Sequence, residues 1–150
     1  MTCGSKFKSG NCVADILREI ADAQNNIAND CCDSSCEQSI ANLLGETPVP
    51  TNLDTVPVLL YCKDCGPFKG YGAPIDNIGN VIGSFYFRVK KVDKDNCAIL
   101  ELLRDPSDSN TDPTSPVEQN TGNLEATDIC ITVNVDCFCH ITCLPAISAL

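Results

Sequence analysis

The chain has 150 residues, and with 43% hydrophobic but only 5% aromatic residues its core must be built mainly from aliphatic side chains. Its length is that of one domain burying roughly 70% of its unfolded surface, and no apolar run approaches the length of a membrane-spanning helix. A formal net charge of −10 argues against a nucleic-acid partner, because such partners are bound by clustered Lys and Arg.

The 12 cysteines are the unusual feature of this composition. Such a density is typical of small secreted disulfide scaffolds. This chain is nevertheless long enough for a hydrophobic core, and its polar start, MTCGSKFKSGNC, lacks the apolar segment of a signal peptide. We therefore expect synthesis in a reducing cytosol, with thiols that either bind metal or become oxidised later.

Two helices are predicted in the N-terminal third. Residues 1–10 are small and polar, which predicts a flexible arm that exposes Cys3. An amphipathic helix over 11–30, with Asn11 as its N-cap, is indicated by apolar residues at three- and four-residue spacing: Val13, Ile16, Ile20, Ala23 and Ile27. A second, shorter helix is expected over 37–44.

The middle of the chain predicts strands. The apolar run 56–62 is typical of a strand, and Pro57 near its start favours an edge position. Alternation predicts a strand over 84–92 whose faces carry Phe85, Phe87 and Val89 on one side and Tyr86, Arg88 and Lys90 on the other. The turn sequence DKDN joins it to 97–103 as a hairpin. Residues 104–123 hold three prolines and no apolar period, which indicates a long loop.

The strongest strand pattern covers residues 129–143. One face holds the apolar set and three cysteines: Ile129, Ile131, Val133, Val135, Cys137, Cys139, Ile141 and Cys143. The other face holds Cys130, Thr132, Asn134, Asp136, Phe138, His140 and Thr142. Because successive strand residues point to opposite sides, Cys137, Cys139 and Cys143 are predicted to face the core while His140 faces away.

This segregation disfavours a single metal site built from those four side chains. Cys137 and Cys139 lie about 6.5 Å apart in a regular strand, so bonds to a facing strand are easier than a bond between them. We favour buried or cross-strand thiols over a zinc site, which usually shows paired cysteine knuckles. A Cys–His nucleophile would need His140, the single histidine, beside a reactive thiol, and alternation places it opposite its neighbours.

The motif CKDC, from Cys62 to Cys65, offers a further alternative. In a thioredoxin-like enzyme it would open a helix, but here GPFKGYG follows, which does not start one. As a zinc knuckle it would pair with Cys32 and Cys36, or with Cys139 and Cys143, and neither pairing is specific. The acidic run DPSDSNTD (105–112) lacks the order and the glycine of a calcium-binding loop.

The segment LEATDICITVNVDCFCHITCLP (124–145) resembles the C-terminal signature of the CotY/CotZ/ExsY spore-coat and exosporium proteins of endospore-forming Bacillales. DTVPVLLY, SFYFRVKKVDKDNCAILELLR and the amphipathic CVADILREIADAQ resemble the family in the same order, so the likeness covers nearly the whole chain. His140 departs from the family pattern, where a small apolar residue is expected, and the CKDC pair looks local to this chain.

The resemblance implies a structural protein that assembles with copies of itself into a roughly hexagonal two-dimensional lattice on the spore surface, locked by disulfides. It would be made in the mother cell and oxidised after that cell lyses. We expect other coat or exosporium proteins as partners, no nucleic acid, no membrane, no cofactor, no metal and no catalytic residue. A cysteine-rich zinc-binding module is the alternative, and a thiol-disulfide enzyme comes third.

The expected fold is mainly β, an antiparallel β-sandwich-like domain preceded by an amphipathic N-terminal α-helix. The domain covers 11–150, with its β core at about 54–145, and follows the arm 1–10. Thiols outside the β core, joined by one on the polar strand face, are the candidates for intermolecular disulfides: Cys3, Cys12, Cys31, Cys32, Cys36 and Cys130. The core or intramolecular thiols are Cys137, Cys139 and Cys143.

Overall fold

The computed structural model describes residues 10–27, 32–46 and 52–150. The N-terminal arm up to residue 9 and the expected sites Cys3 and Cys31 lie outside the described residues. The chain divides into two compact units, 1–33 and 34–150, which are described separately.

The first unit contains helix α1 (Cys12–Asn25). As predicted, Asn11 is its N-cap, and the Asn11 side chain accepts a 3.0 Å hydrogen bond from the N–H of Ala14. The helix ends earlier than the expected residue 30, in a pair of asparagines, which are among the weaker helix formers. Its apolar stripe is exposed and consists of Val13, Ile16, Leu17 and Ile20.

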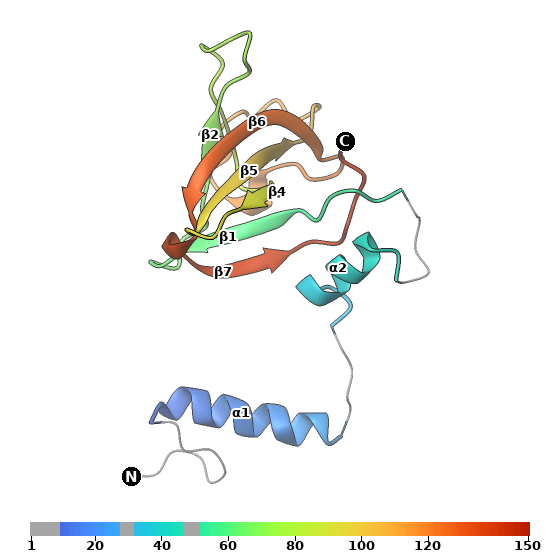
Figure 1. Cartoon of the computed structure of the whole chain (residues 1–150), viewed down its shortest axis with the longest axis vertical. Coiled ribbons are helices and arrows are strands. Elements are labelled where there is room, and N and C mark those ends of the chain that lie inside the picture. The colour runs from blue at the N-terminus through green and yellow to red at the C-terminus, as the bar shows by residue number, and fades with distance from the viewer. Residues whose placement is uncertain (1–9, 28–31, 47–51) are drawn as a thin grey trace. The chain divides into compact units, whose positions relative to one another are not determined.

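The second unit is mainly β and wholly antiparallel. Its elements are α2 (Cys36–Leu43), β1 (Val58–Cys62), β2 (Gly70–Gly72), β3 (Ile82–Ser84), β4 (Phe87–Val92), β5 (Cys97–Arg104), the 3-10 turn η1 (Pro116–Glu118), β6 (Glu125–Asn134), the 3-10 turn η2 (Val135–Cys137) and β7 (Phe138–Cys143). A five-stranded sheet has the order β6-β5-β4-β1-β7, and β2 pairs with β3 alone (Figure 1).

The two sheets form two layers. β2 approaches β6 so closely that a Cβ on Gly70 would lie 2.7 Å from Cδ1 of Ile131 and 2.9 Å from Cε1 of Phe87. Glycine therefore permits the close approach of the layers. The predicted class, a mainly β sandwich-like fold with an N-terminal helix, is confirmed.

Two core clusters lie on the opposite faces of the large sheet. Alternate residues supply them, because side chains along a strand point to opposite sides. The larger cluster contains Val58, Leu60, Phe87, Ala98, Leu100, Leu102, Ile129 and Cys143. The second contains Leu59, Phe85, Tyr86, Leu103, Leu124 and Ala149.

Two details of the strands predicted before residue 97 are wrong. β1 is an interior strand, between β4 and β7, and Pro57 is tolerated because it precedes the strand and only its carbonyl is used, by the N–H of Leu144 at 2.9 Å. The stretch 84–92 is not one strand, since the chain turns a corner between Ser84 and Phe87.

A side chain makes that corner. The Ser84 hydroxyl accepts from the N–H of Tyr86 at 3.0 Å and donates to the carbonyl of Leu103 at 2.6 Å, which replaces regular ladder bonds. Phe85 and Phe87 consequently pack into different clusters instead of sharing a face.

The predicted hairpin, β4–β5, and the predicted long loop after β5 are both present. Asn96 adopts the left-handed region, with φ of 63°, in the DKDN turn. The loop 104–123 is held by the buried Arg104, whose guanidinium donates to the carbonyls of Gly83 at 3.2 Å and Asn110 at 2.6 Å.

Candidate functional site

The C-terminal cysteine segment turns a corner that alternation alone does not reveal. Up to Val135 the predicted pattern holds, with Ile129 buried and Cys130 exposed. The Asn134 side chain then accepts from the N–H of Asp136 at 2.9 Å and forms the 3-10 turn η2. The expected single strand over 129–143 is thus two strands, which lie at opposite edges of the sheet.

The corner changes which cysteines face solvent. Cys137 and Cys139, expected in the core, are both exposed, because the turn and a register shift near Cys62 break the two-residue period. The thiol of Cys139 donates to the carbonyl of Cys62 at 3.1 Å. Cys143, beyond the irregularity, is buried as expected.

Cys36 is expected to bond between chains, but its disulfide lies within the chain. Cys36 forms a disulfide with Cys143, with 4.8 Å between their Cα atoms. This corrects the expectation for Cys36 and gives Cys143 an intramolecular partner. The helix α2 is also attached to this place by a side chain, since the Ser39 hydroxyl donates to the carbonyl of Leu144 at 2.7 Å.

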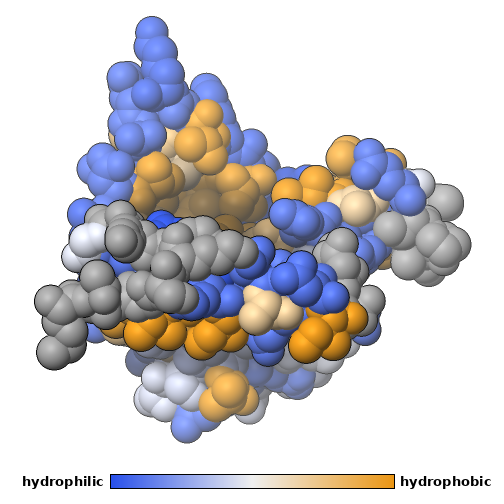
Figure 2. Space-filling view, turned by 90° about the horizontal axis from the view of Figure 1, so that it is seen from below, coloured by the Kyte–Doolittle hydropathy of each residue, from blue (hydrophilic) through white to orange (hydrophobic). Residues whose placement is uncertain are grey.

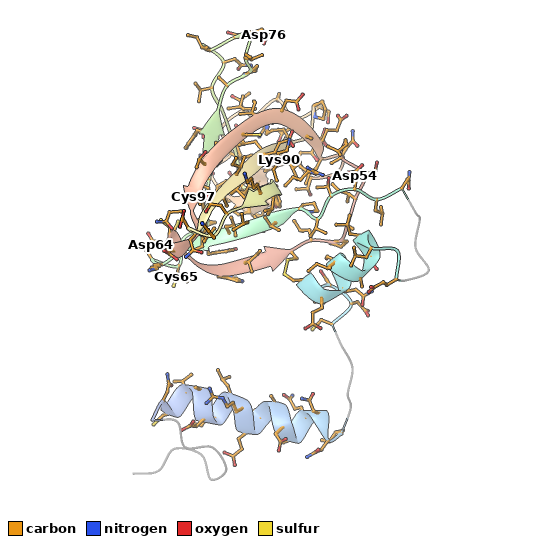
Figure 3. All side chains as sticks on the ribbon, viewed as in Figure 1. Asp54, Asp64, Cys65, Asp76, Lys90 and Cys97 are labelled. Carbon is orange, nitrogen blue, oxygen red and sulfur yellow. A yellow bond between two sulfur atoms is a disulfide. The ribbon has the colours of Figure 1, made fainter. Side chains whose placement is uncertain are left out.

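Several cysteines of the β unit have exposed thiols. Within residues 34–46 and 52–150, five exposed cysteines are free thiols: Cys65, Cys97, Cys130, Cys137 and Cys139. Figure 3 labels Cys65 and Cys97, which lie at the same end of the β unit. In the other unit, Cys32 is exposed and Cys12 is disulfide-bonded. Sequence reasoning did not single out Cys97, although its position directly after a turn is a usable signal of exposure.

The pair Cys62 and Cys65 forms a tight turn. The N–H of Cys65 donates to the carbonyl of Cys62 at 2.9 Å, and Cys65 has a φ of 71°. No helix follows the motif, in agreement with the sequence analysis. Burial raises the pKa of the Cys62 thiol, and Asp64, Cys137 and Cys139 raise it further. This thiol therefore stays protonated at neutral pH, unlike the activated thiol of a redox enzyme.

His140 is exposed, as expected, and its ring is used for stacking. The ring stacks on Tyr61 with centroids 4.5 Å apart, and its Nε2 lies 3.3 Å from the hydroxyl of Thr142. The contacts of this ring are thus with an aromatic side chain and a hydroxyl on the surface of β1 and β7.

The described ranges contain no group of three or more His, Cys, Asp or Glu side chains placed to hold a metal ion. The alternative of a zinc-binding module therefore has no site in that part of the chain. Neither α1 nor α2 is long and apolar enough to cross a membrane, and no other described helix is.

Comparisons with known proteins give consistent results. Residues 1–146 match the family described as Spore coat protein Z. The chain is 32% identical over 147 residues to "Spore coat protein Z" of Bacillus subtilis (strain 168), an alignment that covers 91% of this chain and 90% of that relative. No solved structure matches the chain significantly.

Proposed function

The chain belongs to the spore coat protein Z family, which makes it a structural protein of the spore surface, and on that premise we propose that it assembles with copies of itself into a disulfide-cross-linked, two-dimensional layer. The layer protects the endospore. Other coat or exosporium proteins are its further partners, and no catalytic step is required of it.

The exposed thiols carry this proposal. A chain with one intermolecular bond forms dimers, a chain with two forms linear polymers, and only a chain with more than two forms a branched sheet. The β unit exposes five free thiols, Cys65, Cys97, Cys130, Cys137 and Cys139. Two of them, Cys97 and Cys130, are on paired strands, so each copy presents them at the same positions.

Thiols on the N-terminal side remain candidates in this proposal. Cys32 is exposed, and Cys3 and Cys31 complete the set expected from the sequence. Cys12, already disulfide-bonded in the structure, takes part between chains only after exchange of that bond.

We propose that association precedes oxidation. A disulfide needs Cα atoms within about 6 Å of one another, so random oxidation of free thiols would scramble unless contacts had already selected the partners. Each bond forms when two thiols transfer two electrons and two protons to an oxidant such as a glutathione disulfide, which is reduced to two thiols. The protein is made in the reducing mother cell and meets an oxidising medium only later. Association can therefore come first and oxidation second.

The test is electron microscopy of concentrated protein with and without oxidation. Reduced protein should form ordered sheets that dissolve in mild denaturant, and oxidised sheets should survive it. A variant with serine at all five exposed positions of the β unit should still form sheets, and after oxidation these sheets should resist denaturant less than oxidised wild-type sheets do. The proposal fails if the wild-type protein forms no sheets under either condition.

A further inference from the structure

Cys62, the last residue of β1, is a free thiol that is half-buried, unlike the five exposed free thiols of the β unit. The sheet register pairs Cys62 with Phe138 of β7. Residues directly opposite each other in an antiparallel ladder have Cα atoms about 4.5–5.5 Å apart. The backbone of Cys62 therefore lies beside the segment 137–139, which carries a cysteine on each side of the paired Phe138.

Cys62 and Cys137 line the same hollow, which has a volume of about 550 Å³ and is bounded by residues of β1, β2, β6 and β7. Leu60, two residues before Cys62, belongs to the larger core cluster, and Phe138 packs against that cluster. Alternation therefore directs Cys62 to this face of the sheet. The turn η2, which ends at Cys137, brings the second thiol to the same hollow. Its lining is mostly apolar, and hydrophobic patches also interrupt the largely hydrophilic surface in Figure 2.

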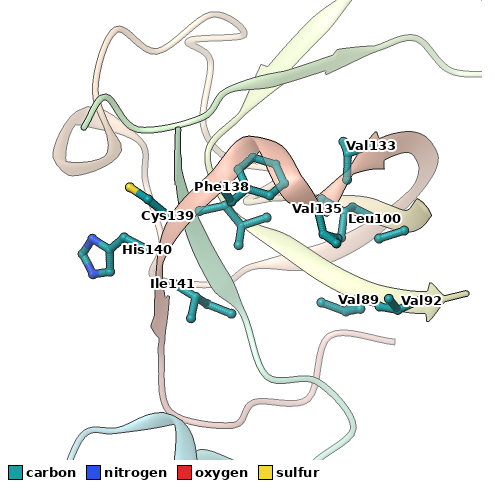
Figure 4. A pocket seen from close by; sticks show the side chains of 11 residues that line it. Val89, Val92, Leu100, Val133, Val135, Phe138, Cys139, His140 and Ile141 are labelled. Carbon is teal, nitrogen blue, oxygen red and sulfur yellow. The ribbon is translucent and has the colours of Figure 1, made fainter. Parts of the chain in front are cut away.

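The other two thiols near Cys62 are placed differently. Cys139 lines a separate hollow, next to His140 (Figure 4), and its thiol donates to the backbone carbonyl of Cys62. Cys65 lies on the exposed turn after β1 and does not line the hollow of Cys62. Cys137 is thus the thiol that shares an open space with Cys62.

The electrostatics of Cys62 agree with this placement. Burial raises the pKa of the Cys62 thiol most, and Asp64, Cys137 and Cys139 raise it further, in this order. A charge acts in this way only at short range, so the thiols are close neighbours. Because the thiolate is the reactive form, the exposed Cys137 is the thiol that an oxidant meets first, and Cys62 is the second to react.

We propose that Cys62 and Cys137 form a second intramolecular disulfide when the protein is oxidised. The Cys137 thiolate attacks a low-molecular-weight disulfide, such as glutathione disulfide, which forms a mixed disulfide and releases one thiol. Cys62 then loses its proton and attacks the Cys137 sulfur, which closes the intramolecular bond and releases the second thiol. The two cysteines together lose two electrons and two protons, and the small disulfide is reduced to two thiols.

This bond fixes the edge strand β7 at both ends. Cys143, its last residue, is already bonded to Cys36, and Cys137 directly precedes its first residue. The bond also withdraws Cys137 from cross-linking between chains. The exposed thiols of the β unit that remain for that role are Cys65, Cys97, Cys130 and Cys139. Because the bond forms within one chain, it does not depend on the proposed self-assembly.

The test is disulfide mapping of dilute protein after oxidation with glutathione disulfide. Remaining thiols are blocked with iodoacetamide, and the monomer fraction is digested without reduction for mass spectrometry. Trypsin cleaves after Lys63 and chymotrypsin after Phe138, so Cys65, Cys137 and Cys139 give different peptides when linked to Cys62. We expect the Cys62 peptide to be linked to the Cys137 peptide. A link from Cys62 to Cys65 or Cys139, or a Cys62 that is still alkylated after oxidation, would overturn the proposal.

Two matched variants give a second readout, since Cys137 and Cys139 are both exposed and two residues apart. In Cys137→Ser the linked peptide should be lost and Cys62 should stay open to alkylation after oxidation. In Cys139→Ser, the control, Cys62 should be protected as in the wild type, and circular dichroism checks that both variants fold. The proposal is wrong if Cys62 is protected equally in both variants, or only in Cys137→Ser.

The outcome is distinguishable from that of the proposed function. A Cys62–Cys137 link in monomers of a protein that forms no sheets would leave this bond standing, while the proposed layer falls. Oxidised sheets in which Cys62 is still a free thiol would have the opposite meaning.

Discussion

Cys36, the first residue of α2, is disulfide-bonded to Cys143, the last residue of β7, across a separation of 107 residues. Cys143 belongs to the larger core cluster, and Cys36 packs against that cluster. The bond therefore attaches a short helix to a strand that lies much later in the sequence. Helices as short as α2 are marginal alone, so its stability depends on this attachment.

Removing that disulfide should destabilise the β unit strongly. In the chain-entropy model, opening a loop of about 100 residues costs about 4.7 kcal/mol. Wild-type protein in reductant, and Cys36→Ser/Cys143→Ser, should both unfold at lower urea concentration than the oxidised wild type. Cys65→Ser is the control and should leave the midpoint unchanged, because Cys65 is an exposed free thiol. Equal midpoints with and without reductant would show that the bond contributes nothing.

Gly70 should not tolerate a side chain. A Cβ there meets the Phe87 ring, which is fully buried and cannot move aside. Gly70→Val is expected to cost about 1–3 kcal/mol, as overpacking does, and to loosen β2 and β3 from β6. Urea denaturation and hydrogen exchange of β2 measure both effects. Gly79→Ala is the control, since its Cβ would lie at an ordinary 3.6 Å from Oδ1 of Asn77. A stable Gly70→Val variant would contradict the two-layer packing.

The buried carboxylate of Glu101 should be needed for the turn in β6 at Asp128. Its Oε2 accepts from the N–H of Asp128 at 2.8 Å, and Asp128 has a strained φ of 62°. Glu101→Ala leaves that N–H without its acceptor and should cost about 1–3 kcal/mol. Glu101→Gln should cost less, because an amide oxygen also accepts. Glu125 is exposed, so Glu125→Ala serves as the control in urea denaturation. A loss of stability in this control as large as in Glu101→Ala would argue against a specific role of Glu101.

Two carboxylates in the loop 104–123 should make the native state less stable at acidic pH. Hydrogen bonds from the Ser107 hydroxyl and N–H lower the pKa of Asp105, and the N–H of Asn120 lowers the pKa of Asp108. A pKa lowered by folding stabilises the native state above the ordinary value of 3.8, and this stability is lost as pH falls through the folded values.

The measurement is the urea midpoint from about pH 6 down to about pH 2. The midpoint should fall most steeply below pH 3.8, the ordinary value for these carboxyls. Asp105→Asn removes one titrating group, so the urea midpoint of this variant should depend less on pH. At the upper end of the pH range its midpoint should be lower than that of the wild type. An unchanged pH profile in that variant would remove Asp105 from the explanation.

Alkylation should distinguish the cysteines by exposure and protonation. Cys62 should react with iodoacetamide more slowly than Cys65 at neutral pH, because burial keeps its pKa high and its thiolate scarce. Mass spectrometry after short labelling times gives the order. Raising the pH should narrow the difference between the two sites. Faster labelling of Cys62 than of Cys65 at neutral pH would contradict the partial burial of this thiol.

Local pattern predicted much of this fold. The capped N-terminal helix, the hairpin around DKDN and the alternation from Ile129 to Val135 depend on neighbouring residues and on the periods of helix and strand, which are visible in the chain. The family resemblance likewise depends on residues in order along the sequence, and the comparisons confirm the spore coat protein Z family.

Only the tertiary structure determined whether each cysteine is buried, bonded or exposed. The turn made by Asn134 reverses the faces of Cys137 and Cys139, and a single side-chain hydrogen bond of this kind does not alter the hydropathy pattern. The order β6-β5-β4-β1-β7 brings Cys143 beside Cys36, because strand order is selected by packing between distant segments. Alternation determined which residues share a strand face, whereas the corners and the strand order determined which thiols are buried, bonded or exposed.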